Sequence, residues 1–277
     1  MARQRWFSDN TENDVMFIDF HTHIFPRHRA PAIMDDLWRR GKIPHYTDGT
    51  LSGLVDSMQT AGITYSLVSR ITTKAENVTA VNQWLLNCRH SQVMPLATVH
   101  PDFAVTTDDL KRLRSEGFKG VKLHPDYQGF YVDDPRMFAF YEAAQQIGFP
   151  VLFHAGLDRG LPPPVHALPH RLLKIHRLFP QMVMIAAHMG GEDNYAETEA
   201  LLLGEEIYLD TAFVLQIMET ETLKRFFRRH PIERILFGTD SPFTDQAAEL
   251  SYLLNIPFLT TAQKELVAGG NAASLIL

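Results

Sequence analysis

The sequence predicts an α/β protein that folds as a (β/α)8 barrel of the TIM type. Eight short apolar runs recur along the 277 residues, and amphipathic stretches with helical periodicity separate most of them. Runs that are apolar at nearly every position are typical of parallel strands buried on both faces. A chain of this length suits one such barrel. We therefore expect a single domain over residues 1–277, with residues 1–14 as an N-terminal extension.

The order of the elements favours a barrel over an open sheet. The predicted strands cover residues 15–20, 63–69, 93–99, 118–123, 150–154, 182–187, 206–211 and 234–239. The predicted helices cover residues 51–62, 75–89, 106–117, 134–148, 169–180 and 216–230, and several begin with an N-cap residue and end at Gly or Pro. The alternative is a doubly wound open sheet. It would have a glycine-rich phosphate loop after the first strand, where this chain has DFHTHIFP.

One connection is much longer than the rest. Residues 24–50 separate the first predicted strand from its helix, whereas most βα loops have only a few residues. The insertion leaves the carboxyl end of the strand, where barrel enzymes build their sites. One interpretation is a lid that carries Phe25, Trp38 and Tyr46. The other is a packing excursion that contains a short helix at 31–40.

The composition is that of a globular protein with no preference for polyanions. The formal net charge is −6 and the isoelectric point is about 6.1. Proteins that bind nucleic acid or anionic membranes are usually basic, so we expect neither partner. There is no apolar signal-peptide core or membrane span, and the single cysteine, Cys88, cannot form an internal disulfide. We expect a cytoplasmic protein with a small-molecule substrate and, by base rate, a homodimer.

Two histidines follow the apolar run of the first predicted strand. Because successive strand side chains point to opposite faces, Asp19, His21 and His23 are expected to share one face. If this strand ends at the mouth of a barrel, both imidazoles converge on one point there. Neutral imidazole is a good ligand for zinc and similar ions, although a His-x-His pair alone is a weak signal.

Other predicted strands also end in ionisable residues. His154 ends the fifth apolar run, His188 follows the sixth and Asp240 follows the eighth. A hydrophobic strand has little reason to end in a group that must be desolvated and paired. Local hydrogen bonds could account for any one of these residues. Together with the histidine pair, however, they predict a shared polar site at the mouth of the barrel.

Four segments resemble the motifs of the metal-dependent amidohydrolase superfamily: DFHTHIFP, VLFHAGLD, IAAHMGG and LFGTDSPF. The resemblance is greatest to the family-2 branch, which includes the aminocarboxymuconate-semialdehyde decarboxylase-like enzymes. It covers nearly the full chain and extends to the final segment LVAGGNAASLIL, which is similar to the terminal helix of that branch. The resemblance implies an amidohydrolase-type barrel and a metal-dependent enzyme.

The resemblance also implies roles for individual residues. His21, His23 and His154 would bind one divalent metal ion. Asp240 would bind the same ion and accept a proton from a water, and His188 would polarise the substrate or transfer a proton, so these two are the predicted catalytic residues. Three imidazoles and a carboxylate suit Zn²⁺, and Mn²⁺, Fe²⁺ or Co²⁺ would also fit.

The fourth predicted strand brings further polar residues towards the same mouth. Period two places Lys122 and His124 on one face, with Tyr127 just beyond. In binuclear members of the superfamily a carbamylated lysine on this strand bridges two metals, and Lys122 could be its counterpart. The family-2 resemblance favours a single metal. In that case we expect Lys122 to be buried and paired, with Asp19 as a candidate partner.

The remaining candidates are contacts for the substrate. Arg70 follows the second predicted strand and could bind a substrate carboxylate, as could Arg159 beyond the fifth. His124, Tyr127 and Lys122 are further candidates at the mouth. Four further histidines, which we expect to be structural or mostly on the surface and in loops, are His100, His166, His170 and His176.

Two activities suit this set of residues. The first, which we favour, is a metal-dependent hydrolase that activates a water to cleave an amide, lactone or ester bond of a small anionic substrate. The second is a metal-dependent, non-oxidative decarboxylase of a small unsaturated or aromatic carboxylic acid. Phosphoester hydrolysis is disfavoured, because the related deoxyribonuclease branch has a glutamate where this chain has His124. A non-enzymatic binding module is disfavoured because it would leave an open metal site unused.

Overall fold

The computed structural model describes residues 15–277, and the predicted extension at residues 1–14 lies outside this range. Its strands all pair in parallel, in two sheets with the orders β1-β2-β3 and β4-β5-β6-β7-β8-β9. The strands are β1 (Ile18–His23), β2 (Tyr65–Ser69), β3 (Val93–Pro95), β4 (Ala97–Thr98), β5 (Val121–Leu123), β6 (Val151–Phe153), β7 (Met184–Ala186), β8 (Tyr208–Asp210) and β9 (Ile235–Leu236). Each lies in or overlaps one of the eight predicted runs.

Hydrogen bonds at both seams join the two sheets into one closed barrel. β3 and β4 are a single predicted strand interrupted at Leu96, whose N–H donates to the Val68 carbonyl at 2.8 Å. The Ala97 N–H then donates to the Gly120 carbonyl at 2.8 Å, which carries the pairing over to β5. At the other seam the N–H of Phe20 donates to the carbonyl of Phe237 at 2.8 Å. The predicted (β/α)8 barrel is confirmed, and its eight strands explain why each run is apolar throughout.

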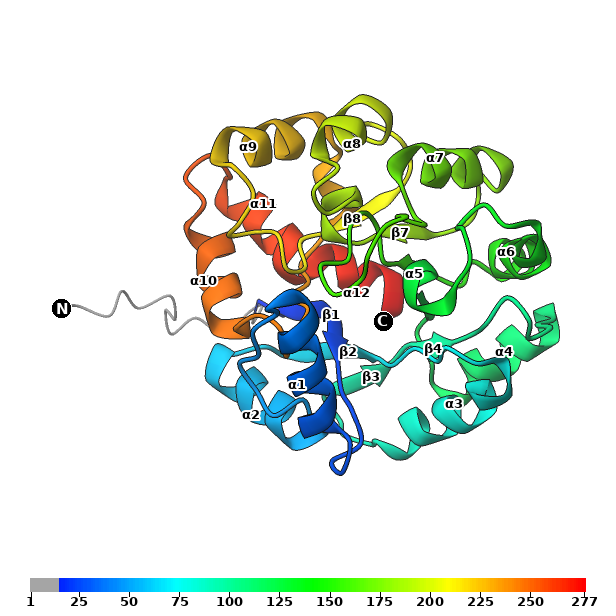
Figure 1. Cartoon of the computed structure of the whole chain (residues 1–277). Coiled ribbons are helices and arrows are strands. Elements are labelled where there is room, and N and C mark those ends of the chain that lie inside the picture. The colour runs from blue at the N-terminus through cyan, green and yellow to red at the C-terminus, as the bar shows by residue number, and fades with distance from the viewer. Residues whose placement is uncertain (1–14) are drawn as a thin grey trace.

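Helices form a ring around the barrel (Figure 1). The α-helices are α1 (Ala30–Gly41), α2 (Leu51–Ala61), α3 (Val78–Asn87), α4 (Thr107–Glu116), α5 (Pro125–Gln128), α6 (Phe138–Ile147), α7 (Pro169–Leu178), α8 (Tyr195–Leu201), α9 (Thr220–Arg229), α10 (Gln246–Asn255), α11 (Thr261–Glu265) and α12 (Asn271–Ile276). Short 3-10 turns are η1 (Ala75–Asn77), η2 (Pro135–Met137), η3 (His188–Gly190) and η4 (Ile232–Arg234), and η5 (Leu266–Gly270) is a π-helix. No helix within residues 15–277 combines the length and apolar character needed to cross a lipid bilayer.

Several helices, α2 and α4 among them, begin where the sequence provides a side-chain cap. Thr106 caps α4 by accepting a hydrogen bond from the N–H of Asp109, and the Asp109 side chain accepts one from the N–H of Thr106 in return. Thr50 caps α2 in the same way through the N–H of Gly53. Each such bond satisfies a backbone donor that the first helical turn leaves unpaired. These local bonds fix where the outer helices start and so how they pack on the barrel.

The chain's last helix lies against one end of the barrel, and the loops that follow the strands lie at the other. Ala272 and Ile276 of α12 belong to the apolar cluster that contains Ile18 and Leu236 of the barrel. In Figure 1, α12 crosses the middle of the ring of helices. The opposite end, where the strands end, is therefore the open one.

A bulge in β1 decides which of its side chains face inwards. Asp19 pairs with Ser66, and Thr22 pairs with Val68, so β1 has one extra residue between these two positions. Phe20 packs inside the barrel with residues of opposite strands, including Leu152. Asp19 points outwards, where its carboxylate accepts a hydrogen bond from Gln246 of α10 at 2.7 Å. The expectation that Asp19 shares a face with the two histidines is therefore wrong, because the bulge breaks the strict alternation of the strand.

Candidate active site

His21 and His23 lie side by side at the carboxyl end of β1, and both face Asp240. Their ring centroids are 5.1 Å apart. The Oδ1 atom of Asp240 lies 2.9 Å from Nε2 of His23 and 3.3 Å from Nε2 of His21. Asp240 has a left-handed backbone (φ 67°), which costs free energy for a non-glycine residue, and its N–H donates to the His21 carbonyl at 2.8 Å. The three side chains offer ligand atoms within 4.8 Å of one another, a spacing that can hold a metal ion.

Neighbouring side chains hold both rings by their Nδ1 atoms. Nδ1 of His21 lies 2.9 Å from Oδ2 of Asp210 at the end of β8, and Nδ1 of His23 lies 3.1 Å from Oγ of Ser69 at the end of β2. Metal-binding histidines are usually oriented in this way, because the bond at one nitrogen directs the lone pair of the other to the ion. Neither Asp210 nor Ser69 is among the residues predicted from the sequence. The signal available for Asp210 is its place at the end of the predicted strand 206–211.

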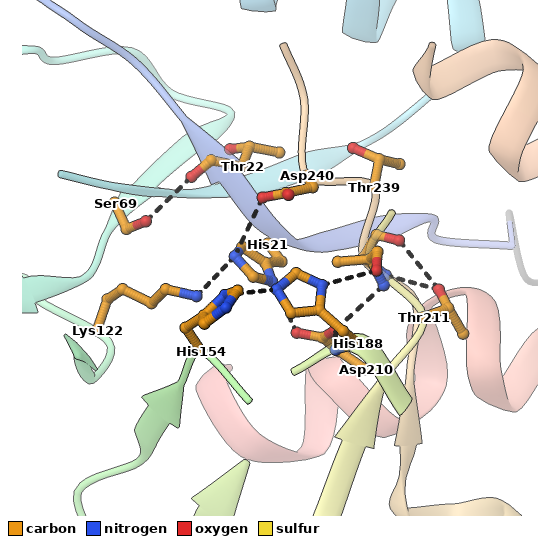
Figure 2. A network of polar contacts seen from close by, with 12 residues as sticks. His21, Thr22, Ser69, Lys122, His154, His188, Asp210, Thr211, Thr239 and Asp240 are labelled. Carbon is orange, nitrogen blue, oxygen red and sulfur yellow. Dashed lines mark hydrogen bonds and ion pairs between the residues drawn. The ribbon is translucent and has the colours of Figure 1, made fainter. Parts of the chain in front are cut away.

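A chain of hydrogen bonds fixes the tautomer of His154 (Figure 2). Nδ1 of His188 lies 2.9 Å from the Ala212 carbonyl oxygen, which can only accept, so Nδ1 donates and Nε2 is left as an acceptor. Nδ1 of His154 donates to this Nε2 at 2.9 Å. The Nε2 of His154 therefore carries a lone pair. It is buried and has no hydrogen-bond partner among residues 15–277, which is unusual for a polar atom in a protein interior.

The electrostatics of the cluster favour neutral rings for His21 and His154 and an ionised carboxylate for Asp240. Burial lowers the pKa of His154 well below its usual value, and the neighbouring imidazoles add to this effect. Burial and then the charge of Lys122 lower the pKa of His21 to about 4. Burial alone would raise the pKa of Asp240, but the attraction of His21 and the other histidines outweighs it and holds that pKa well below its usual range. These are the protonation states that binding of a divalent ion requires.

Lys122 lies inside the barrel, but its predicted partner does not. Nζ of Lys122 is 2.7 Å from Nε2 of His21. No ion pair joins Lys122 to Asp19 in the described part of the chain, because the bulge in β1 turns Asp19 towards α10. The predicted pairing of these two residues is therefore wrong. Burial lowers the pKa of Lys122 to about 8, although Asp210 and Asp240 oppose this shift.

A second polar group lies beside His154. The ring of His124 stacks on that of His154 with centroids 4.0 Å apart, and Nε2 of His124 lies 3.0 Å from Oδ2 of Asp158. Tyr127 meets His124 edge-on at 4.6 Å, and within the described residues its buried hydroxyl has no hydrogen-bond partner. Asp158 is not among the residues predicted from the sequence, although it ends the motif VLFHAGLD, four residues beyond His154. His124 and Tyr127 thus lie next to the predicted ligands, as their strand position indicated.

These groups line a cavity of about 980 Å³. The insertion after β1 forms one of its walls, through Phe25 and residues of α1 that include Ile33 and Leu37. At the end of α1 a side chain on Gly41 would come within 2.7 Å of the Arg159 carbonyl oxygen, so this end of the helix packs directly on the loop after β6. The insertion therefore contains a helix, which spans the predicted range 31–40. Of the three residues that a lid was expected to carry, Phe25 lines the cavity, whereas Trp38 and Tyr46 are exposed and do not.

The other predicted residues separate into two groups. Arg70 and Arg159 line the cavity. None of the four histidines predicted to be structural or on the surface lines it, and His176 is buried rather than on the surface as predicted. His176 sits on the inner face of α7, whose periodicity turns it away from solvent. The four are His100, His166, His170 and His176.

A parallel barrel that gathers imidazoles and carboxylates at the carboxyl ends of its strands is an architecture of metal-dependent enzymes. Residues 18–276 match the Amidohydro_2 model, described as Amidohydrolase, and the chain belongs to this family. The resemblance found in the four motifs is thereby confirmed. Enzymes of this family bind a divalent metal ion. No curated protein matches the chain significantly in sequence.

Solved structures with the same fold cover almost the whole chain. The 5-carboxyvanillate decarboxylase of Sphingomonas paucimobilis aligns with a TM-score of 0.67 at 14% identity, over 95% of this chain and 99% of that one. A dihydroxybenzoic acid decarboxylase of Polaromonas sp. JS666, with bound manganese and an inhibitor, aligns with a TM-score of 0.70 at 18% identity, over 94% and 96%. A putative 2-pyrone-4,6-dicarboxylic acid hydrolase of Pseudomonas putida aligns with a TM-score of 0.67 at 15% identity, over 95% and 98%. At these identities the likeness shows the fold.

Proposed function

We propose that this protein is a metal-dependent hydrolase that activates a water to cleave an amide, lactone or ester bond of a small anionic substrate. The observation that carries the proposal is the convergence of two imidazole Nε2 atoms on Asp240, next to a histidine whose Nε2 has no partner. His188 links the two parts, because its ring centroid lies 5.3 Å from that of His21 and 4.7 Å from that of His154. Three imidazoles and one carboxylate are a ligand set that zinc accepts, and a water can join them when the ion expands to five-coordination.

The residues present fit a divalent ion in their chemistry as well as in their arrangement. The Nε2 atom of His154 carries a buried lone pair without a partner among residues 15–277. Burying such an acceptor costs free energy unless a donor or a metal ion binds it. The Nδ1 anchors of His21 and His23 leave their Nε2 atoms directed at Asp240. We propose zinc as the ion, with manganese, iron or cobalt as alternatives that the same ligands accept.

In this proposal the chain's own residues supply the acid–base chemistry and the binding. A divalent ion held by the four residues would lower the pKa of a water and polarise the bond under attack. Asp240, whose pKa is held low, accepts the proton of the attacking water. His188, oriented by the Ala212 carbonyl, polarises the substrate or transfers a proton. Lys122, His124, Tyr127 and Arg70 contact the substrate.

A second candidate is a metal-dependent, non-oxidative decarboxylase of a small unsaturated or aromatic carboxylic acid. Two of the similar solved structures are named as decarboxylases of aromatic acids, and they favour this candidate. The same four residues would hold the metal, and His188 would supply a proton to the carbon that loses its carboxylate. The two candidates therefore differ in the bond that breaks, while the residues that hold the metal are the same.

The experiment that separates these candidates measures two products from one reaction. The zinc-loaded protein is given a panel of lactones, esters, amides and aromatic carboxylic acids, and acid release and carbon dioxide release are followed in parallel. The proposal expects acid release without carbon dioxide, and loss of that activity in Asp240→Asn. Carbon dioxide release would establish the second candidate instead. A protein that binds zinc but releases neither product from the whole panel would contradict both.

A further inference from the structure

The arginines around the cavity differ in whether a carboxylate accompanies them. Three have such a partner. Nη2 of Arg40 lies 2.7 Å from Oδ2 of Asp36, and Nη2 of Arg39 lies 3.6 Å from Oδ1 of the same residue. Nε of Arg159 donates to Oε1 of the buried Glu192 at 2.6 Å. The charge of Arg159 is therefore compensated by Glu192 and that of Arg40 by Asp36, which Arg39 approaches at the longer distance.

The other two arginines of the cavity, Arg29 and Arg70, have no acidic partner among residues 15–277. Arg29 immediately precedes α1, and Arg70 immediately follows β2, so the insertion and the barrel each contribute one. Burial lowers the pKa of Arg70, and the positive charge of Arg29 lowers it further. Two like charges that face one cavity without a counter-ion repel each other, a cost that a bound anion would remove.

No acid in the cavity wall is free to supply that counter-ion. Four acidic residues line the cavity, and each has another partner: Asp36 pairs with Arg40, Asp158 with His124, Glu192 with Arg159, and Asp240 with the two histidines of β1. The position beside Arg29 and Arg70 therefore lacks an anion of its own. Arg70 is also held in place, because its guanidinium lies 5.1 Å from the centre of the Trp84 ring.

We propose that Arg29 and Arg70 bind a carboxylate of the substrate that takes no part in the reaction and is retained in the product. The inference rests on the proposed function, which places the reacting bond at His21, His23, His154 and Asp240. Guanidinium groups match the planar carboxylate and can bind it through paired hydrogen bonds. Such bonds stabilise the charge of a carboxylate, so they oppose its loss as carbon dioxide and suit a group that only anchors.

The rest of the cavity wall indicates the chemical character of the part of the substrate that lies between the reacting bond and the retained carboxylate. Between the polar groups the wall is apolar, through Phe25, Ile33, Leu37, Phe213 and Phe243. Apolar walls with a few placed charges are typical of sites for small organic ligands. The substrate class is therefore a hydrophobic or aromatic acid with a reactive group at one position and a retained carboxylate at another.

Binding of simple acids to the full chain tests this proposal without any turnover. Benzoate and benzene-1,3-dicarboxylate are titrated calorimetrically into the zinc-loaded protein and into the protein stripped of metal. Loss of a hydrogen bond to a charged group should weaken benzoate binding about tenfold to a hundredfold in Arg29→Gln and in Arg70→Gln. The matched control is Arg40→Gln, whose charge Asp36 already compensates, and there the affinity should stay within about twofold.

The dicarboxylate and the metal-free protein complete the test. In the zinc-loaded protein the dicarboxylate should bind more tightly than benzoate, and Arg70→Gln should remove that advantage. Benzoate should still bind to the metal-free protein, and that binding should still depend on the two arginines. An incorrect assignment of the metal site would therefore leave this part of the result unchanged. Benzoate affinities unchanged in both Arg29→Gln and Arg70→Gln, or lowered equally in Arg40→Gln, would overturn the proposal. Arg29 is exposed, so its variant is expected to fold even if Arg70→Gln does not.

Discussion

Asp19 and Asp240 lie at the same seam of the barrel, between β1 and the end of β9, and their surroundings move their pKa values in opposite directions. Asp19 is fully buried, and burial raises its pKa to about 7 despite hydrogen bonds from Gln246 and Thr239. Asp240 is also largely shielded from water, yet the histidines hold its pKa well below its usual range. Neutral donors can satisfy the oxygens of a carboxylate, but they do not offset the cost of burying its charge.

The difference explains how β1 can contribute both a structural carboxylate and residues of the candidate active site. The bulge in β1 sends Asp19 out to a neutral structural network and His21 into the barrel mouth. Titratable groups collected inside the barrel become a site, whereas the carboxylate of Asp19, outside it, becomes a structural element. The same substitution, Asp to Asn, should therefore have different effects at positions 19 and 240.

The largest effect is expected for activity in Asp240→Asn. An asparagine keeps the size of the side chain but can neither accept a proton nor balance the charge of a metal ion. We expect kcat/KM to fall by about 10²–10⁴-fold, the usual contribution of a positioned acid or base. Steady-state kinetics on any substrate found in the panel measures this loss.

Asp19→Asn is the matched control, because it makes the same chemical change at the same seam. Its kcat/KM and its metal content should remain within a few-fold of wild type, since Asp19 faces α10 and not the cavity. If the two variants lost activity equally, the distinction drawn between the two carboxylates would be wrong.

The second effect is on the pH dependence of stability. The pKa of Asp19 is raised from 3.8 to about 7 on folding, so between these values the folded state binds more protons than the unfolded state. The free energy of unfolding should therefore fall as the pH rises through this window, by at most about 4 kcal/mol from this group. In Asp19→Asn that contribution should vanish, and Gln246 Oε1, which lacks a partner among the described residues, can accept from the new amide. Denaturant unfolding of both proteins at pH 4 and pH 7 measures it.

A smaller effect is expected for the anchor of His21. Oδ1 of Asp210 accepts the N–H of His188, and Oδ2 faces Nδ1 of His21. In Asp210→Asn the amide can occupy the second position only as a donor, which forces the proton of His21 onto Nε2. We expect zinc affinity to fall by about 10–100-fold, the usual cost of losing such a partner. Competition with a chromophoric chelator measures the affinity.

Ser69→Ala provides the comparison for the second imidazole. It removes a neutral hydrogen bond of 3.1 Å to His23 and leaves the tautomer free to adapt, so its effect should be the smaller of the two. A loss in Ser69→Ala that exceeds the loss in Asp210→Asn would contradict the idea that Asp210 sets the tautomer.

The barrel and most of the candidate site could be predicted from the sequence because both depend on local patterns. Continuous apolar runs identified the strands, and an ionisable residue at the end of a run indicated the mouth. His21, His23 and Asp240 were found in this way, and the structure brings them within 4.8 Å. The periodicity of the flanking segments also located α2, α4 and α7.

The partners that orient these residues could not be predicted, because they depend on contacts between distant parts of the chain. Asp210 meets His21 across 189 positions, and only closure of the barrel brings them together. The misplaced pairing of Lys122 with Asp19 has a similar origin, because a one-residue bulge changes the face of a side chain without any clear mark in the sequence. Arg29 was not predicted because the sequence indicates the helix of the insertion but not which residues beside that helix face the cavity.

The most direct test of this account is the metal content of the purified protein, measured by elemental analysis after zinc is added and the excess removed. The account predicts about one zinc ion per chain in the wild type, as expected for a mononuclear site. It predicts close to none in His154→Ala, whose missing Nε2 is the unpartnered atom beside His188. A wild-type protein that retains no divalent ion, or a His154→Ala variant that retains a full equivalent, would contradict it.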